Sequence, residues 1–309
     1  MRTLLAAWAV GLLSMALPAA ATPFSFSTGD PDGLMAMATR PSTGGKIEIE
    51  AADDFMLAGT TSITSATFTG LLSSQASLAD IGAVGVEIYR VFPQDSTDPP
   101  SGNVTTRANS PSDVAFAERD SGALDLTFTV STLNASFTAS NSVVNGIHPL
   151  PSEQTGGDGP VTGLEVEFTV TFTSPFVLPG GHYFFVPQVG LSVPFSDFLW
   201  LSAPRPIVAP GTPFSPDLQA WIRNEDLAPD WLRVGTDIVG GNPAPTFNAT
   251  FSLTGESSST SVPEPATLAL IGVALIGLVG ARQWSGRRAL HRRLRLMRRR
   301  YSTRERSAR

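Results

Sequence analysis

Apolar and polar residues alternate along many short segments in the middle of the chain. In the segment 164–173, Val and Phe occupy every second position, and Glu and Thr occupy most of the positions between them. A period of two places apolar side chains on one face of a β-strand and polar side chains on the other. Further segments rich in Thr, Val and Phe predict strands at 46–50, 62–69, 82–91, 124–130, 182–189, 198–202, near Trp221, at 231–234 and at 246–253.

The residues between these segments favour an all-β fold. Gly, Pro, Ser, Asn and Asp separate the segments, and no part of this region sustains a helical period over three turns. About nine strands joined by turns predict a single β-sandwich over residues 22–254, of the jelly-roll or the immunoglobulin-like type. Periodicity does not choose between these topologies. Residues 141–162 are expected to form a long loop, and the Ser- and Thr-rich residues 255–261 a flexible linker.

The first 21 residues have the pattern of an export signal. Arg2 gives a charged start, an apolar run follows from Leu4 to Leu17, and small residues then form a site of the Ala-x-Ala type. Cleavage is therefore expected between Ala21 and Thr22. An uncleaved anchor is the alternative, but the run is short and a polar, turn-rich segment follows it directly.

The other end of the chain has the pattern of a membrane anchor. An apolar run covers residues 266–281, and twelve arginines occupy the 28 residues after it. The run is slightly shorter than the ~17–25 residues of a typical spanning helix, but flanking arginines can reach the membrane interface. A transmembrane helix at 266–281 is therefore predicted, with Arg282, Arg287 and Arg288 as stop-transfer residues on the cytoplasmic side. The alternative is a buried core helix.

A short motif, Pro263, Glu264 and Pro265, precedes the apolar run. Together with the run and the Arg cluster from Arg282, it resembles the PEP-CTERM sorting signal of Gram-negative bacteria, here over residues 262–300. The resemblance implies that exosortase, a membrane protease-transpeptidase, acts at the motif after an inner-membrane stage. It also implies a final place in the cell envelope, at the surface or in the extracellular matrix, near extracellular polysaccharide and biofilm.

The basic tail continues past the usual end of that signal, through a tail extension at 301–309. Leu290, Leu294 and Met297 have the spacing of a short basic amphipathic helix, which would bind lipid or nucleic acid. The simpler interpretation is a strong stop-transfer anchor, since the tail of an exported body stays on the cytoplasmic side.

Charge is distributed unevenly along the chain. Residues 22–262 contain eight Lys or Arg and 25 Asp or Glu, a formal charge of −17, whereas the whole chain has a net charge of −6. We expect no nucleic-acid partner, because phosphate neutralisation needs basic residues that the body lacks. The chain has no cysteine, which excludes disulfides, thiol nucleophiles, Cys-ligated zinc and iron–sulfur clusters.

Few residues have the spacing of a catalytic site. His148 and His182 are the histidines of the body, and no nucleophile elbow, zincin motif or P-loop accompanies them. Glu165 and Glu167 lie two residues apart on one predicted strand, where two carboxylates could flank a glycosidic bond. A solvated strand face is the simpler interpretation, so no catalytic residues are assigned.

Two sets of residues are candidates for binding. Oxygen ligands from Asp30, Asp32, Asp53 and Asp54 could hold calcium, although Asx-turns at strand ends explain the same residues. No other cofactor is expected. A second set could bind sugar by ring stacking and hydrogen bonding, if its aromatic members are exposed rather than core fillers. This set consists of Trp221, Arg223 and Trp231.

The sequence therefore supports three hypotheses about function. The first is a non-enzymatic surface or matrix protein that is sorted through its C-terminal signal and associates with extracellular polysaccharide. The second is a carbohydrate-binding, lectin-like module on the same fold, which needs an exposed Trp. The third is an exported glycan-active hydrolase, which needs two carboxylates about 5–10 Å apart in a cleft.

Overall fold

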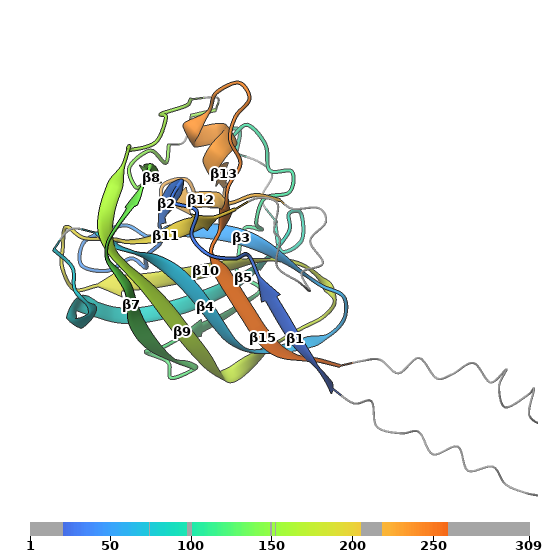
Figure 1. The fold of residues 1–309 in the computed structure, drawn as a ribbon. Helices are drawn as coiled ribbons and strands as arrows, with labels where there is room; N and C mark the ends of the chain where they lie inside the picture. The colour runs from blue at the N-terminus through green and yellow to red at the C-terminus, as the bar shows by residue number, and fades with distance from the viewer. Residues whose placement is uncertain are drawn as a thin grey trace, which may run out of the picture. The chain divides into compact units, whose positions relative to one another are not determined.

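A computed structural model describes residues 21–73, 75–97, 101–148, 150–151, 153–204 and 218–258. These residues form an all-β body with two sheets (Figure 1). The predicted signal peptide before Ala21, the sorting motif, the transmembrane segment 266–281 and the basic tail lie outside the described residues. Within the described ranges, no helix has the length and apolar character needed to span a membrane.

The first sheet has nine strands and is centred on the long strand β4. β9 pairs with one edge of β4, while β15 and β11 pair with successive parts of the other edge. β7 pairs with the far edge of β9, and β1 with the far edge of β15. The strands of this sheet are β1 (Ala21–Ser27), β2 (Met35–Ala38), β4 (Thr61–Ser73), β7 (Leu126–Ala139), β8 (Asn141–Val143), β9 (Val161–Leu178), β11 (Phe198–Ala203), β14 (Asn248–Ala249) and β15 (Phe251–Ser258).

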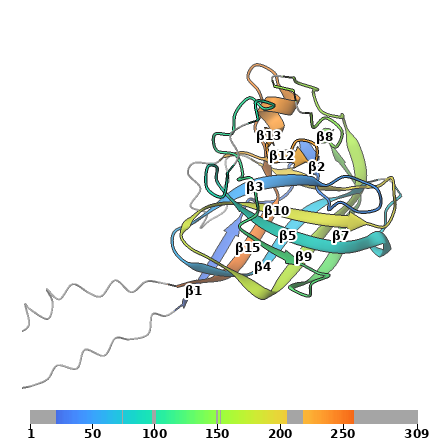
Figure 2. The ribbon, with the colours of Figure 1, turned by 180° about the vertical axis from the view of Figure 1, so that it is seen from behind.

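The second sheet has six antiparallel strands in the order β13-β12-β3-β10-β5-β6. Figure 2 shows β3, β10 and β5 side by side at its centre. Its strands are β3 (Ile49–Leu57), β5 (Ile81–Arg90), β6 (Ala117–Asp120), β10 (Gly181–Leu191), β12 (Trp221–Asn224) and β13 (Leu232–Arg233). A 3₁₀-helix (Leu78–Asp80) and a π-helical turn (Val234–Val239) complete the described elements.

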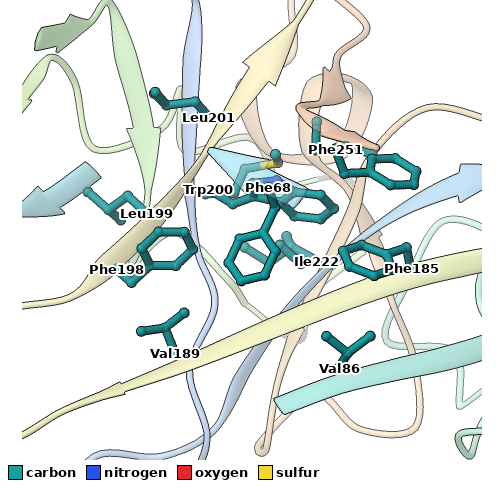
Figure 3. Close-up of a cluster of buried hydrophobic side chains, with 14 of the residues drawn as sticks. Phe68, Val86, Phe185, Val189, Phe198, Leu199, Trp200, Leu201, Ile222 and Phe251 are labelled. Atoms are coloured by element: carbon teal, nitrogen blue, oxygen red, sulfur yellow. The ribbon is translucent and has the colours of Figure 1, made fainter. Parts of the chain in front are cut away.

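The two sheets face each other across one aromatic core (Figure 3). Phe251 of β15 stacks on Phe185 of β10, with ring centroids 5.0 Å apart and planes 2° from parallel. Phe68 of β4 also contacts Phe185, and their ring centroids are 6.3 Å apart. Trp200 of β11 is fully buried, and its indole N–H donates to the Thr250 carbonyl at 2.7 Å. The ring contacts of Phe185 with Phe251 and Phe68 join the sheets, because such ring pairs add to the stabilisation from apolar burial.

The long alternating segments are strands as predicted, and the all-β, two-sheet architecture is confirmed. The predicted linker at 255–261 is wrong over its first four residues, because β15 continues to Ser258. Ser257 and Ser258 of this segment belong to a strand that pairs with both β1 and β4. The folded body therefore extends beyond residue 254, and Ala21, at the predicted cleavage site, is paired with Ser258.

The predicted loop at 141–162 also differs from the structure at both ends. β8 occupies its first three residues, in parallel pairing with β2, and β9 begins at Val161. Between them, Asp158 accepts hydrogen bonds from the backbone N–H groups of Val144 and Asn145 at 2.6 and 3.0 Å. These bonds hold part of the loop against the end of β8.

Candidate functional site

The three residues predicted to bind sugar are buried in the structure. Trp221 and Trp231 are 1% and 0% exposed, and Arg223 is 6% exposed. The indole N–H of Trp221 donates to the Leu218 carbonyl at 3.2 Å, and that of Trp231 to the Ser112 carbonyl at 3.1 Å. The sugar-stacking prediction is therefore wrong for these residues. The indoles fill a second apolar cluster, with Tyr89 and Phe184, on the outer face of the six-stranded sheet.

Arg223 lies between aromatic rings and a carboxylate. Its guanidinium group is 4.3 Å from the Trp231 ring centroid and 5.2 Å from that of Tyr89. Nε donates to Glu50, and Nη1 donates to the Asp113 carbonyl at 3.1 Å. The charge is thus paired and hydrogen-bonded, as a buried guanidinium group must be.

Glu50 and Glu87 form a carboxyl pair beside this arginine. The Tyr89 hydroxyl oxygen lies 2.6 Å from Glu50 Oε1 and 2.7 Å from Glu87 Oε2. Burial, followed by the negative charge of Glu50, raises the pKa of Glu87 to about 8. A hydroxyl donates only one hydrogen, so both contacts are satisfied when Tyr89 donates to Glu50 and protonated Glu87 donates to Tyr89. The pair is joined by the phenol rather than separated by a space for a substrate.

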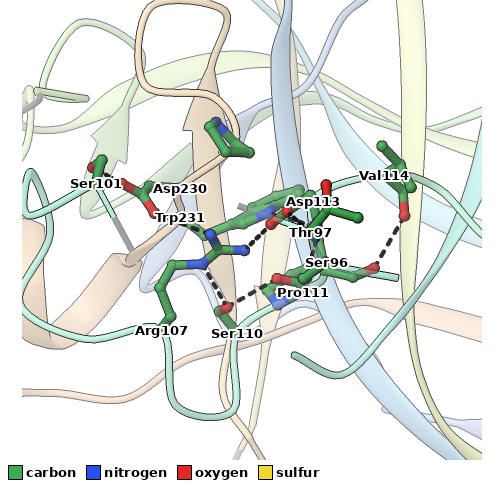
Figure 4. Close-up of polar contacts among 12 residues, drawn as sticks. Ser96, Thr97, Ser101, Arg107, Ser110, Pro111, Asp113, Val114, Asp230 and Trp231 are labelled. Carbon is green, nitrogen blue, oxygen red and sulfur yellow. Dashed lines mark hydrogen bonds and ion pairs between the residues drawn. The ribbon is translucent and has the colours of Figure 1, made fainter. Parts of the chain in front are cut away.

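A second buried ionic network includes Asp113, whose carbonyl accepts from Arg223 (Figure 4). Arg107 Nη2 donates to Asp113 at 2.6 Å, and Nη1 donates to Asp230 at 3.1 Å. The guanidinium group also lies 4.7 Å from the ring centroid of Phe92. The network connects the segment between β5 and β6 to the turn that precedes β13, so its evident role is to hold these loops together.

The four aspartates considered for calcium do not come together. Asp53 Oδ2 accepts from the Ala249 N–H at 2.8 Å, whereas Asp54 accepts from the Leu218 N–H at 3.0 Å and contacts His182. Asp32 accepts from the Leu34 N–H at 2.9 Å and from the Ser202 hydroxyl. Asp30, which is exposed, lines a recess described below. Across the residues that the structure describes, no group of three or more His, Asp or Glu side chains could hold a metal ion.

The residues considered for catalysis have contacts with other parts of the body. Glu165 is buried and accepts a hydrogen bond from the Asn134 amide, while Glu167 is half-buried. His182 contacts Asp54, and His148 lies 3.9 Å from Glu153. Within the described residues, these contacts do not assemble a hydrolytic site from the four side chains.

The outer face of the nine-stranded sheet has a feature that the strand pattern alone does not reveal. Register aligns exposed or half-buried Ser and Thr side chains in two rows across β1, β15, β4, β9 and β7. We call these two rows the hydroxyl face. One row is Ser27, Ser252, Thr67, Thr169 and Thr129, and the other is Ser25, Thr254, Ser65, Thr171 and Thr127.

A polar recess of about 220 Å³ adjoins the first of these rows. Ser27, Thr67 and Ser252 of the hydroxyl face line it, together with the carboxylates of Asp30 and Glu167. Sequence reasoning identified both acids but assigned them to other sites. Only the folded structure shows that both line the same recess.

Comparison with known proteins identifies one part of the chain. Residues 261–288 match the family described as the PEP-CTERM protein-sorting motif. This confirms the resemblance based on Pro263, Glu264 and Pro265. The search of curated proteins finds no match to the chain. The family identified therefore concerns sorting: the chain has the motif of an exported protein that exosortase handles at the membrane.

Proposed function

We propose that this protein is a non-enzymatic component of the cell surface or extracellular matrix of a Gram-negative bacterium, where it associates with extracellular polysaccharide. The observation that supports it most strongly is the sorting motif at residues 261–288. An export signal that ends near Ala21 precedes an all-β body, and the sorting motif follows that body. This order fits export, sorting by exosortase and release of the body from its anchor.

The membrane stage depends on the segment after the motif. The apolar residues 266–281 hold the chain in the inner membrane, and Arg282, Arg287 and Arg288 stop its transfer. The acidic body, with a formal charge of −17 over residues 22–262, stays on the exported side. Exosortase is the protein partner, and it acts at Pro263, Glu264 and Pro265.

Replacing the motif tests the proposal. In cells that contain exosortase, P263A/E264A/P265A should remain in the inner-membrane fraction, while the wild-type protein reaches the outer envelope or the medium. A matched control, S257A/S258A, changes the end of β15 and leaves the motif intact. Normal release of the motif variant would contradict the proposal, and retention of the control variant would show that the effect is not specific to the motif.

A further inference from the structure

The hydroxyl face is regular in both directions of the sheet. Alternate residues along a strand are about 6.8 Å apart, and neighbouring strands about 4.8 Å apart. The intervening residues point to the core: Phe26, Leu253, Ala66 and Val170 are all buried. The packed core therefore holds the ten hydroxyl-bearing residues in a fixed grid.

Part of the grid has unused hydrogen-bonding capacity. Thr67 and Ser252 are hydrogen-bonded to each other at 2.6 Å, and Ser65 contacts Thr254. The hydroxyls of Thr127, Thr129, Thr169 and Thr171 form no hydrogen bond within the described part of the chain, and all four residues are exposed. Each offers one donor and two lone pairs to a ligand.

The charge of the surrounding strands limits the chemistry of such a ligand. β1, β4, β7, β9 and β15 contain no Lys or Arg, and the rows themselves contain no charged residue. An anionic polymer would find no cation here and would be repelled by a body of charge −17. A protein partner would need a large apolar patch or charged anchors, neither of which is present in the rows. A neutral ligand with many hydroxyl groups matches the face best.

The recess adds a concave site beside the first row of the grid. The carboxylates of Asp30 and Glu167 accept hydrogen bonds without donating any, so they suit adjacent hydroxyl groups of a sugar ring. A volume of about 220 Å³ is suited to a single ring rather than a long segment.

We propose that the hydroxyl face binds a neutral, extended polysaccharide that crosses the strands, with one sugar in the recess beside Asp30 and Glu167. This inference rests on the proposed association with polysaccharide and assigns it to one surface. The polymer runs along the rows, where each strand presents a hydroxyl group at nearly the spacing of successive sugars. Thr127, Thr129, Thr169 and Thr171 supply the direct contacts, and the two carboxylates fix the sugar in the recess.

The test is affinity electrophoresis of the full chain in detergent, through native gels that contain hydroxyethyl cellulose or dextran. At least one of these neutral polymers should retard the wild-type protein. In T127V/T129V/T169V/T171V, valine keeps the β-branched shape and removes four hydroxyls, so the affinity should fall at least about tenfold. The same positions changed to Ser should keep most of the affinity, and E167Q should weaken it.

A matched control removes two hydroxyls from the same strands outside the rows. Thr138 and Thr162 are exposed, lie on β7 and β9 and are hydrogen-bonded to each other at 2.7 Å, so T138V/T162V should bind like wild type. Retardation that is unchanged in the quadruple Val variant would overturn the hydroxyl face while leaving polysaccharide association intact. Loss of binding in both the quadruple Val and the quadruple Ser variants would also overturn it, because the hydroxyls would not be responsible. A wild-type protein that neither polymer retards would overturn the hydroxyl face as a site for neutral polysaccharide. It would leave the proposed sorting to the separate test by the motif variant.

Discussion

Arg107 shows how single residues hold the loops over the six-stranded sheet. Its side chain is 1% exposed and pairs with Asp113 and Asp230, which are also buried. In R107A both carboxylates lose their cation while they remain in a low-dielectric site, so the free energy of unfolding should fall by about 3–5 kcal/mol. Urea unfolding followed by Trp fluorescence measures this change, since Trp231 lies beside the network.

The control for this variant is an ion pair nearer to solvent. Arg90 and Asp95 have side chains that are 33% and 21% exposed, so R90A should cost only about 0–1 kcal/mol. Equal losses in R107A and R90A would contradict the assigned role of the buried network.

Glu87 makes the stability of the body depend on pH. Its pKa in the folded protein is about 8, raised from 4.5 chiefly by burial and then by the charge of Glu50. As pH rises between these values, the unfolded chain loses this proton before the folded protein does, so the contribution of Glu87 to stability falls. Burial also raises the pKa of Glu48, which acts in the same direction.

A neutral amide at position 87 should therefore reduce this pH dependence. Between about pH 5 and about pH 8, the free energy of unfolding should fall less in E87Q than in the wild-type protein. The matched control is E118Q, because Glu118 lies directly opposite Glu87 on β6 and is exposed. If the free energy of unfolding falls with pH as steeply in E87Q as in E118Q, Glu87 does not have the raised pKa described above.

At the scale of elements, β15 depends on one glycine. Gly255 lies at a β-bulge against β4, where an added Cβ would be 2.0 Å from the Ser62 carbonyl oxygen. G255A should therefore force the strand to shift, with a loss of about 1–3 kcal/mol. At Gly59 a Cβ meets nothing within 4 Å, so G59A is the control. The hydrogen-exchange rates of the β15 amides should rise in G255A and stay unchanged in G59A. Unchanged rates in G255A would contradict the close pairing of β15 with β4 at Gly255.

Alternation predicted strands such as β9, which has one buried and one exposed face over much of its length. β9 reads this way over most of its 18 residues, and its alternating burial confirms the pattern. The sequence pattern does not predict β2, because all four of its residues are buried and Met35–Ala38 has no polar residues alternating with apolar ones. β15 was cut short because serine and threonine are typical of linkers, although they also suit strand faces that hydrogen-bond across neighbours.

Burial and register could not be predicted from the chain alone. Nothing in the sequence around Trp221 or Trp231 distinguishes a stacking platform from a core. The structure decides it, because both indoles are buried in one apolar cluster and Trp231 donates to Ser112 in the segment between β5 and β6. Likewise, Thr169 reads as one exposed residue of one strand. It becomes part of a row only through pairing with Thr67 and Thr129, which are remote in sequence.

At the scale of the whole molecule, the two ends of the described body are neighbours. Ala21, at the predicted cleavage site, pairs with Ser258, which precedes the sorting motif by only a few residues. Signal-peptide removal and sorting would therefore act at adjacent ends of the same sheet. After both steps, the released chain would consist almost entirely of the acidic all-β body.

The intact mass of the protein recovered from native cell envelope and medium tests this account most directly. We predict a species that begins at Thr22 and ends between Val262 and Pro265, with or without a group added at that end. A species that begins at Thr22 and retains Arg309 in both fractions would contradict processing at the motif.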